Sequence, residues 1–252
     1  MMLTGNTILI TGGGTGIGRG LAEALHKLGN KVIISGRKRA ALEAVVAANP
    51  GIQAVELDIA NLESIKKVSA KLIADHPSLN TLINNAGIML LDDVSTAVDA
   101  GVLESQIATN LAGTIRLTSA LIDHLKKQKR ATVVYNSSTL AFTPLAMFAV
   151  YSATKAALHS YAMSQRFMLR NTSVAVKEIA PPWVGTGLVG GVDDPRAVPV
   201  ARFVSDTLNV LATDANEILV EEAKVFRNHA GPGEYGFIEE LNRRMAEVFS
   251  GS

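Results

Sequence analysis

Tyr151 and Lys155 lie four residues apart in a stretch with helical spacing, so they are expected to share one face of a helix. A lysine ammonium beside a phenol stabilises the phenolate. Lowering the pKa of a tyrosine from about 10 to about 7 takes on the order of 4 kcal/mol of such interaction. A tyrosine tuned in this way donates a proton to an alkoxide at neutral pH. The pair is a weak signal on its own, and it indicates general acid/base catalysis.

Two further polar residues fit the same chemistry. Ser138 follows the apolar run 132–135, where a hydroxyl would face the crevice at the carboxyl ends of parallel strands. Asn110 lies in the middle of helical sequence, where an inward-facing amide is unusual. Taken singly, Ser138 is an ordinary loop serine and Asn110 a surface residue. Together with the tyrosine and the lysine they favour a catalytic group.

A glycine-rich loop, TGGGTGIG at residues 11–18, joins the first apolar run to the first helical stretch. The N–H groups and the dipole at a helix start form an anion site, and glycines let the backbone approach a pyrophosphate. The common fingerprint G-x-G-x-x-G fits in no register, whereas Gly12, Gly16 and Gly18 fit G-x-x-x-G-x-G. We therefore predict that the loop binds a dinucleotide. The predicted contacts are Gly12, Gly14, Thr15, Gly16 and Ile17.

Two other nucleotide loops and one structural explanation compete with this interpretation. A P-loop is nearly matched, but Arg19 and Gly20 stand where lysine and serine or threonine are required. A methyltransferase-type loop predicts an acidic residue at the end of the second strand, where Gly36 and Arg37 stand instead. A glycine-rich turn without function is the third alternative.

The basic residues after the second apolar run bear on the choice of cofactor. In a dinucleotide fold this position meets the adenosine ribose, and a carboxylate there accepts from the 2′-OH and repels a 2′-phosphate. Gly36 has neither charge nor bulk, Arg37 offers a planar fork of donors suited to phosphate, and Lys38 adds charge. Arg39 is expected to point to solvent. The sequence predicts NADP(H); the alternative is that all are exposed helix-start charges, which the helix dipole disfavours.

These residues need a scaffold, and the chain alternates strand-like and helical sequence. Short apolar runs rich in β-branched residues are expected to be strands at 7–10, 31–35, 53–57, 81–84, 132–135 and 174–179. Helical spacing lies between them, as with Leu21, Ala22 and Leu25. Such alternation predicts an α/β fold, a Rossmann-type doubly wound parallel sheet with helices on both faces.

The sequence after Pro181 is less regular. We expect a loop, a helix over 199–213, a short strand over 217–220 and a terminal helix over 234–249. No low-complexity linker divides the chain, so residues 1–252 are predicted to form a single domain. Within it, the segment of about 182–215 is expected to act as substrate loop and lid.

Composition excludes several classes of function. Of the 252 residues 48% are hydrophobic and 19% charged, and a net charge of +1 gives no broad field for nucleic acid or an acidic membrane. The absence of cysteine removes disulfides, thiolate chemistry and zinc–cysteine sites, which suits a reducing cytosol. The five histidines lack paired ligand spacing, so no metal is expected. With no signal-peptide pattern or long apolar run, we expect a soluble cytoplasmic protein.

In this order and spacing, TGGGTGIG, Asp58-Ile59, the NNAG of residues 84–87, Asn110, Ser138 and the YSATK of residues 151–155 resemble the short-chain dehydrogenase/reductase family. The resemblance covers about residues 5–190. It implies a catalytic tetrad of Asn110, Ser138, Tyr151 and Lys155. By this resemblance Tyr151 is the general acid/base, Ser138 orients the substrate carbonyl, and Asn110 positions a water. Lys155 would bind the nicotinamide ribose and lower the tyrosine pKa, so Tyr151 and Lys155 also count as cofactor contacts.

The resemblance also implies further cofactor contacts and self-association. Asp58 and Ile59 would hold the adenine, and Asn85-Ala86-Gly87 the adenosine ribose region. The expected contacts on the nicotinamide side are Pro181, Val184 and Thr186. A homo-dimer or homo-tetramer is implied through long helices like those over about 100–127 and 150–170.

Two departures from the family pattern stand out. The family usually has Pro-Gly-x-Val-x-Thr after the sixth strand, and Pro182 replaces that glycine and stiffens the loop. The common glycine-rich last strand is missing, while DPRAVP at 194–199 resembles a bacterial branch whose substrates are poorly defined.

Apolar residues flank the tetrad and suggest the substrate. These are Leu145, Met147, Phe148, Trp183, Leu188 and Val189. They predict a small or medium apolar ketone or aldehyde, the alternative being that they pack in the core or in a subunit interface. The predicted function is thus reversible, NADP-dependent reduction of a carbonyl to an alcohol, as in a carbonyl reductase or alcohol dehydrogenase. A non-catalytic dinucleotide-binding regulator is the alternative on the same fold, and the intact tetrad argues against it.

Overall fold

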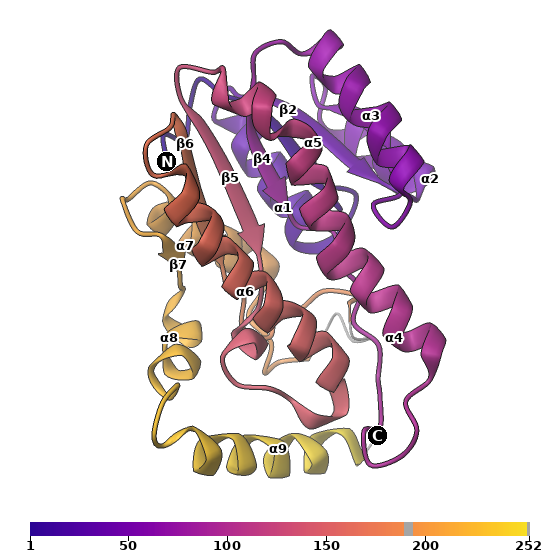
Figure 1. The fold of residues 1–252 in the computed structure, drawn as a ribbon, viewed down its shortest axis with the longest axis vertical. Helices are drawn as coiled ribbons and strands as arrows, with labels where there is room; N and C mark the ends of the chain where they lie inside the picture. The colour runs from indigo at the N-terminus through magenta and orange to yellow at the C-terminus, as the bar shows by residue number, and fades with distance from the viewer. Residues whose placement is uncertain (189–193, 251–252) are drawn as a thin grey trace.

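The computed structural model describes residues 1–188 and 194–250, with side chains up to Val248. Within these residues seven parallel strands form one sheet in the order β3-β2-β1-β4-β5-β6-β7 (Figure 1). The strands are β1 (Thr7–Thr11), β2 (Lys31–Gly36), β3 (Gln53–Glu56), β4 (Leu79–Asn84), β5 (Ala131–Asn136), β6 (Val174–Ile179) and β7 (Glu217–Ile218). The predicted doubly wound parallel sheet is confirmed, and its strand order reverses at β1, beside which dinucleotides bind in such folds.

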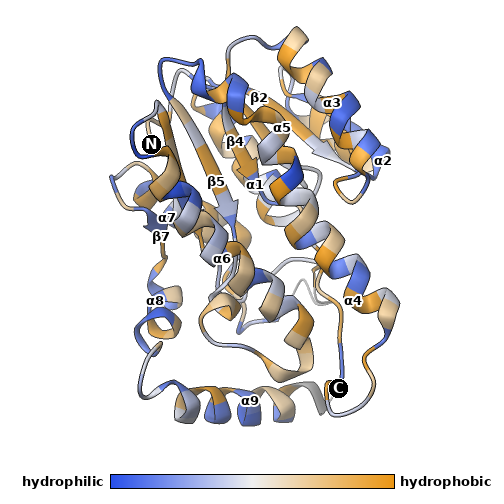
Figure 2. Ribbon diagram, in the orientation of Figure 1, coloured by the Kyte–Doolittle hydropathy of each residue, from blue (hydrophilic) through white to orange (hydrophobic). Residues whose placement is uncertain are grey.

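Helices cover both faces of this sheet. They are α1 (Gly16–Lys27), α2 (Arg39–Ala48), α3 (Leu62–Asp75), α4 (Ala100–Gln106), α5 (Thr114–Lys126), α6 (Ala149–Leu169), α7 (Val200–Leu211), α8 (Glu221–Asn228) and α9 (Glu234–Ser250). Alternation along β1 feeds two cores: Ile8 and Ile10 pack with α1, α2 and α7, and Leu9 packs with α3, α5 and α6. Figure 2 shows hydrophobic strands β4 and β5 beneath helices of mixed character. Because the strands are parallel, their carboxyl ends lie together at one edge of the sheet, and the two cores fix the sheet between the helices.

The long helix predicted up to about residue 127 is interrupted. Between α4 and α5 the backbone forms a π-helical segment, Ile107–Gly113, which contains Asn110. Gly113 allows close packing here, because a Cβ on it would lie 2.1 Å from the carbonyl oxygen of Ile59. Wide turns of this kind are rare and occur frequently at functional sites.

The region after β6 agrees with the sequence only in part. The helix expected over 199–213 is α7, and the terminal helix expected over 234–249 is α9. The predicted strand over 217–220 is shorter, and α8 was not predicted because its sequence is polar and only Ala223 is buried. No helix among residues 1–188 and 194–250 is long and apolar enough to cross a membrane.

The predicted lid segment of about 182–215 divides into two parts. Phe203, Val204 and Leu211 of α7 are buried in the core on the α1 side of the sheet. Only the described residues 182–184 and 186–188 of this segment line the main cavity. The helical half of the segment is therefore part of the packed fold.

Candidate active site

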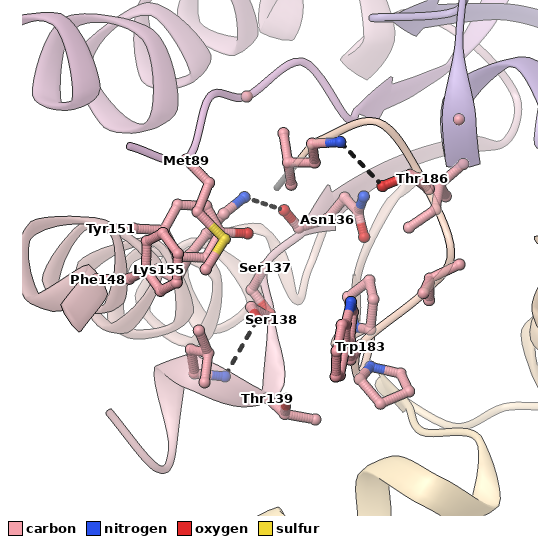
Figure 3. Close-up of a pocket in the computed structure, with 18 of the residues that line it drawn as sticks. Met89, Asn136, Ser137, Ser138, Thr139, Phe148, Tyr151, Lys155, Trp183 and Thr186 are labelled. Carbon is pink, nitrogen blue, oxygen red and sulfur yellow. Dashed lines mark hydrogen bonds between the residues drawn. The ribbon is translucent and has the colours of Figure 1, made fainter. Parts of the chain in front are cut away.

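A cavity of about 640 Å³ opens at the carboxyl ends of the strands. Figure 3 shows Tyr151 and Lys155 on one side of it and Trp183 and Thr186 on the other. The predicted site residues in its wall are Gly12, Thr15, Gly16, Ile17, Lys38, Asn85, Ala86, Gly87, Ser138, Tyr151, Lys155, Pro181, Val184 and Thr186. Gly14, Arg37 and Ile59 line a neighbouring cavity of about 260 Å³, and Asp58 and Asn110 line neither.

Helix α6 carries the acid/base pair. Tyr151 and Lys155 are both buried, and the Lys155 Nζ lies 5.4 Å from the centroid of the Tyr151 ring. Lys155 donates a hydrogen bond of 2.8 Å to the Asn136 carbonyl oxygen at the end of β5. Asp92 caps the helix from a distant loop, because its two carboxylate oxygens accept from the N–H groups of Ala149 and Val150 at 2.9 and 2.8 Å. The cap and the lysine together fix α6 against the sheet.

The pKa values of this pair differ from the sequence-based expectation. Burial raises the pKa of Tyr151 to about 12, and a hydrogen bond with Ser138 opposes the rise. Burial lowers the pKa of Lys155 to about 8, and the charge of Glu178 opposes the fall. The expected lowering of the tyrosine pKa towards 7 is therefore wrong for this structure, because burial disfavours the phenolate more than the hydrogen bond with Ser138 favours it. Tyr151 holds its proton at neutral pH, which is the state that a general acid requires.

Ser138 lies two residues beyond β5, as predicted. Its Oγ accepts a hydrogen bond of 3.1 Å from the Leu140 N–H, and this bond caps a short 3-10 turn. The turn directs the hydroxyl to the tyrosine side of the cavity (Figure 3).

Asn110 holds the loop that follows β4. Its Oδ1 accepts from the Ile88 N–H at 2.9 Å, and its Nδ2 donates to the Ile88 carbonyl at 2.8 Å and to the Thr154 hydroxyl at 3.2 Å. A Cβ on Gly87 would lie 3.3 Å from the Asn110 Oδ1 and 3.7 Å from the Lys155 Nζ. The loop, the π-helical segment and α6 thus meet at one point beside the lysine.

The glycine loop has the geometry of a phosphate cradle. Gly12 and Gly16 have φ angles of +67° and +54°, which favour glycine. A Cβ on Gly18 would lie 2.4 Å from both the Gly12 carbonyl oxygen and the Asn85 Nδ2. Thr15 forms no side-chain cap on α1, and the first turn of α1 has no acidic residue. Both features leave the helix start suited to an anion, so the loop fits the pyrophosphate of a dinucleotide.

The smaller cavity lies beyond this loop. Gly36, Arg37 and Lys38 line it, and Lys38 also lines the larger one. Within the described residues Arg37 and Lys38 form no ion pair, whereas Arg39 pairs with Glu43 at 2.7 Å and points away, as predicted. Two exposed and uncompensated cations therefore border the cavity.

Asp58 does not reach either cavity. Its carboxylate accepts from the Ala60 N–H at 3.0 Å, and its own N–H donates to the Ser64 hydroxyl at 3.1 Å. The side chain thus shapes the turn before α3, and of the predicted Asp58-Ile59 pair only Ile59 borders a cavity.

The tyrosine end of the larger cavity is apolar. Four of the six predicted flanking residues line it: Leu145, Phe148, Trp183 and Leu188. Met147 packs beside this cluster without lining the cavity, and Val189 lies outside the described residues. The apolar wall residues missed by the sequence analysis are Met89, Leu140, Phe226, Leu241 and Met245.

Two of the missed residues come from the C-terminal helix α9. Leu241 and Met245 are four residues apart and so share a face, which is the signal that could have identified them. Asn242 anchors the helix: its Nδ2 donates to the Pro144 carbonyl at 3.0 Å, and its Oδ1 accepts from the Ala146 N–H. The cavity wall therefore combines segments about 100 residues apart in the sequence.

No group of three or more potential metal ligands occurs within the described part of the chain. The orphaned, buried Oδ1 of Asn136 at this cavity and the glycine cradle fit a dinucleotide.

Comparison with known proteins agrees with this geometry. The sequence profile of the family described as short chain dehydrogenase matches residues 6–197. The chain is 37% identical over 248 residues to the uncharacterized oxidoreductase DltE of Bacillus subtilis, covering 96% of this chain and 98% of that protein. It is 31% identical over 187 residues to the NADP-dependent 3-hydroxy acid dehydrogenase YdfG of Salmonella typhi, covering 74% and 73%.

A solved structure extends the likeness to the whole fold. A short chain dehydrogenase from Burkholderia cenocepacia, crystallised in complex with NADP, superposes with a TM-score of 0.84 at 27% identity, covering 96% of this chain and 99% of that one. With the family profile spanning the glycine loop, the tetrad positions and the first six strands, the chain belongs to the short-chain dehydrogenase/reductase family and is an oxidoreductase of the kind that uses a nicotinamide dinucleotide.

Proposed function

We propose that the protein uses NADP(H) to reduce an apolar ketone or aldehyde reversibly to the alcohol, with Tyr151 as general acid/base. The observation that carries the proposal is the meeting of Tyr151, Ser138 and Lys155 in the wall of one cavity that also contains the glycine loop. A site built only to sense a dinucleotide needs no protonated phenol beside an apolar recess.

Each side chain has a role in this reaction. When bound, the nicotinamide supplies the hydride. Tyr151, protonated at neutral pH, gives its proton to the carbonyl oxygen in reduction and takes it back in oxidation. Ser138 donates to the same oxygen and orients it. Lys155 holds positive charge behind the phenol, and Asn110 keeps the loop at Ile88 in place beside the lysine.

The preference for NADP(H) rests on the smaller cavity. Arg37 and Lys38 offer two cations that no described carboxylate neutralises, and Gly36 presents no acid to repel a 2′-phosphate. Two similar proteins carry NADP in their names or were crystallised with it. Both observations favour the phosphorylated cofactor.

The substrate class follows from the wall around Tyr151. The apolar side chains there come from the loop after β4, the 3-10 turns before α6, α8 and α9. Lys38 and Lys155 are the cations among the described lining residues; Lys155 donates to the Asn136 carbonyl, and its other donors are assigned to the cofactor ribose in this proposal. A carboxylate or phosphate on the substrate would therefore find no free partner near the tyrosine, which favours an uncharged apolar carbonyl.

The test is a spectrophotometric assay of NADPH and NADH oxidation with alkyl and aryl ketones, aldehydes, sugars and oxo acids. We expect turnover with NADPH and an apolar carbonyl. Tight NADPH binding without turnover of any carbonyl would instead support the dinucleotide-binding regulator, and a better rate with sugars or oxo acids would contradict the substrate class.

Self-association is a further proposal. Helices α4 and α6 and the π-helical segment carry exposed apolar side chains, namely Leu103, Ile107, Met163, Phe167 and Met168. Figure 1 shows α4, α5 and α6 on the same face of the sheet. A second copy of the chain would cover these side chains. Sedimentation velocity at micromolar concentration should show a dimer or tetramer, and a monomer would contradict the proposal.

A further inference from the structure

A buried carboxylate lies behind the acid/base pair. Glu178 is on β6 and has no exposed surface. Its Oε1 accepts a hydrogen bond of 2.5 Å from the Ser137 hydroxyl, and its Oε2 lies 2.7 Å from the His159 Nδ1. Burial of a carboxylate is costly unless its oxygens are bonded and its charge is balanced. The three residues therefore form one unit, which none of the roles above explains.

This unit is connected to the site from two sides. On α6, His159 lies four residues after Lys155 and eight after Tyr151, so it continues their face of the helix by two further turns from the tyrosine. After β5, Ser137 stands between Asn136, which accepts from Lys155, and Ser138. The backbone N–H of Ser137 donates to the Ile179 carbonyl at 2.8 Å, and Ser137 also lines the cavity. Glu178 thus links the segment 136–138 to α6 from the side opposite the substrate.

The charges around Glu178 can be assigned in pairs. Lys155 and His159 face it from α6, Arg227 from α8, and Glu217 occupies the paired position on β7. Arg227 is already bound by Glu217 at 2.9 Å. Glu178 is consequently free to balance the positive charge on α6.

We propose that Glu178, supported by His159, is a positioning residue for the reaction: its carboxylate holds the segment 136–138 against α6 and supplies the negative charge that keeps Lys155 protonated. The inference rests on the proposed function. The effect of the Glu178 charge on the pKa of Lys155 has a definite direction. Burial lowers the pKa of Lys155 to about 8 and Glu178 opposes this, so loss of the carboxylate moves that pKa further down. The lysine then loses its proton at a lower pH.

The decisive variant is Glu178→Gln, which keeps size and removes charge. We expect the alkaline limb of the pH profile to move down by about one pH unit or more, so that kcat/KM for reduction at pH 8 falls by about fivefold or more. The matched control is the double variant Glu217→Gln/Arg227→Gln. It removes the neighbouring carboxylate together with its cation, so no uncompensated charge is left beside Glu178, and we expect it to keep the wild-type limb and at least about half of the rate.

Glu178→Asp separates charge from position. It retains the carboxylate but is one methylene shorter, so the alkaline limb should return to the wild-type pH while kcat stays reduced. A folded Glu178→Gln protein with the wild-type limb would overturn the proposal. If Glu178→Gln does not fold, His159→Ala becomes the deciding variant. Without the His159 contact the carboxylate no longer holds α6 against the segment 136–138, so kcat should fall in the folded protein, and an unchanged kcat would overturn the proposal.

A second readout keeps this test distinct from that of the proposed function. NADPH affinity is measured by fluorescence titration between pH 6 and 9 on the same proteins. If the wild type turns over no carbonyl, the proposed function fails while the titration still decides the inference. Glu178→Gln should weaken NADPH binding increasingly above pH 7, and the Glu217→Gln/Arg227→Gln double variant should not. Parallel curves for the two variants would overturn the inference.

Discussion

The two ends of the main cavity are built in opposite ways. At the dinucleotide end, β1, the glycine loop and α1 are contiguous in sequence, and β1 is buried at every position. At the tyrosine end, the wall is assembled from Met89, Leu140, Phe226 and the helix α9, and none of the described side chains of α9 is fully buried. Figure 1 shows α9 lying across the end of the molecule, away from the sheet.

This difference indicates which properties each end can change. A Cβ at Gly18 would lie 2.4 Å from the Gly12 carbonyl oxygen, so this position of the glycine loop tolerates almost no variation. The α9 wall is held by Asn242 and a few apolar contacts, so its side chains can change without disturbing the fold. The scaffold thus places the wall that contacts the substrate on a segment that is packed less tightly than the glycine loop.

The largest effect is expected where the two ends meet. Tyr151→Phe removes the acid and leaves the ring in place, so kcat should fall by about 10²-fold or more while NADPH affinity changes little. A steady-state assay of NADPH oxidation measures kcat, and fluorescence titration of the same preparation measures NADPH affinity. If the variant keeps more than about a tenth of the wild-type kcat, Tyr151 is not the acid.

A smaller effect, confined to the cofactor end, is expected from Gly36→Asp. A Cβ at Gly36 meets only Leu42 Cδ2 at 3.7 Å, so the side chain fits. The new carboxylate should lower kcat/KM for NADPH by about 10- to 100-fold and leave NADH equal or improved, because it repels a 2′-phosphate and accepts from a 2′-OH. Comparable kcat/KM for the two cofactors in the wild type, within about threefold, would contradict the predicted preference.

Arg37→Ala sharpens the same prediction. It should raise KM for NADPH by about tenfold and KM for NADH by less than about threefold, since one charge-assisted hydrogen bond is lost. Arg39→Ala is the matched control, because Arg39 pairs with Glu43 and lines neither cavity. Equal effects of the two substitutions would show that only the general charge of this surface matters.

The smallest effect is expected at the substrate end. Asn242→Ala removes the anchor of α9 to the segment 144–146, and KM for the carbonyl should rise by about fivefold with NADPH affinity unchanged. Because α9 is only partly buried, the free energy of unfolding should fall by less than about 1 kcal/mol. Glu239→Ala, on the exposed face of the same helix, serves as control. If Asn242→Ala weakened NADPH binding as much as it raised KM for the carbonyl, the two ends of the cavity would not act independently.

The sequence predicted most where the determinants are local. The glycine loop, the strands and the Tyr151–Lys155 spacing are short patterns, and the sheet and the shared cavity wall agree with them. The contribution of α9 was missed because the i, i+4 pair Leu241 and Met245 does not reveal what it packs against. The prediction of a lowered tyrosine pKa was wrong for a related reason, since the burial that raises this pKa depends on the whole fold.

The π-helical segment determines how the chain responds to the deletion of a residue. A π turn holds one more residue than an α turn, so α4 and α5 are out of phase by about 100° relative to one uninterrupted α-helix. Deleting a single residue from 107–113 would convert the segment into ordinary α-helix without unfolding it. The deletion would turn one helix against the other and carry Asn110 away from Ile88. The number of residues between α4 and α5 thus sets the position of Asn110, and no substitution could restore that position after a deletion.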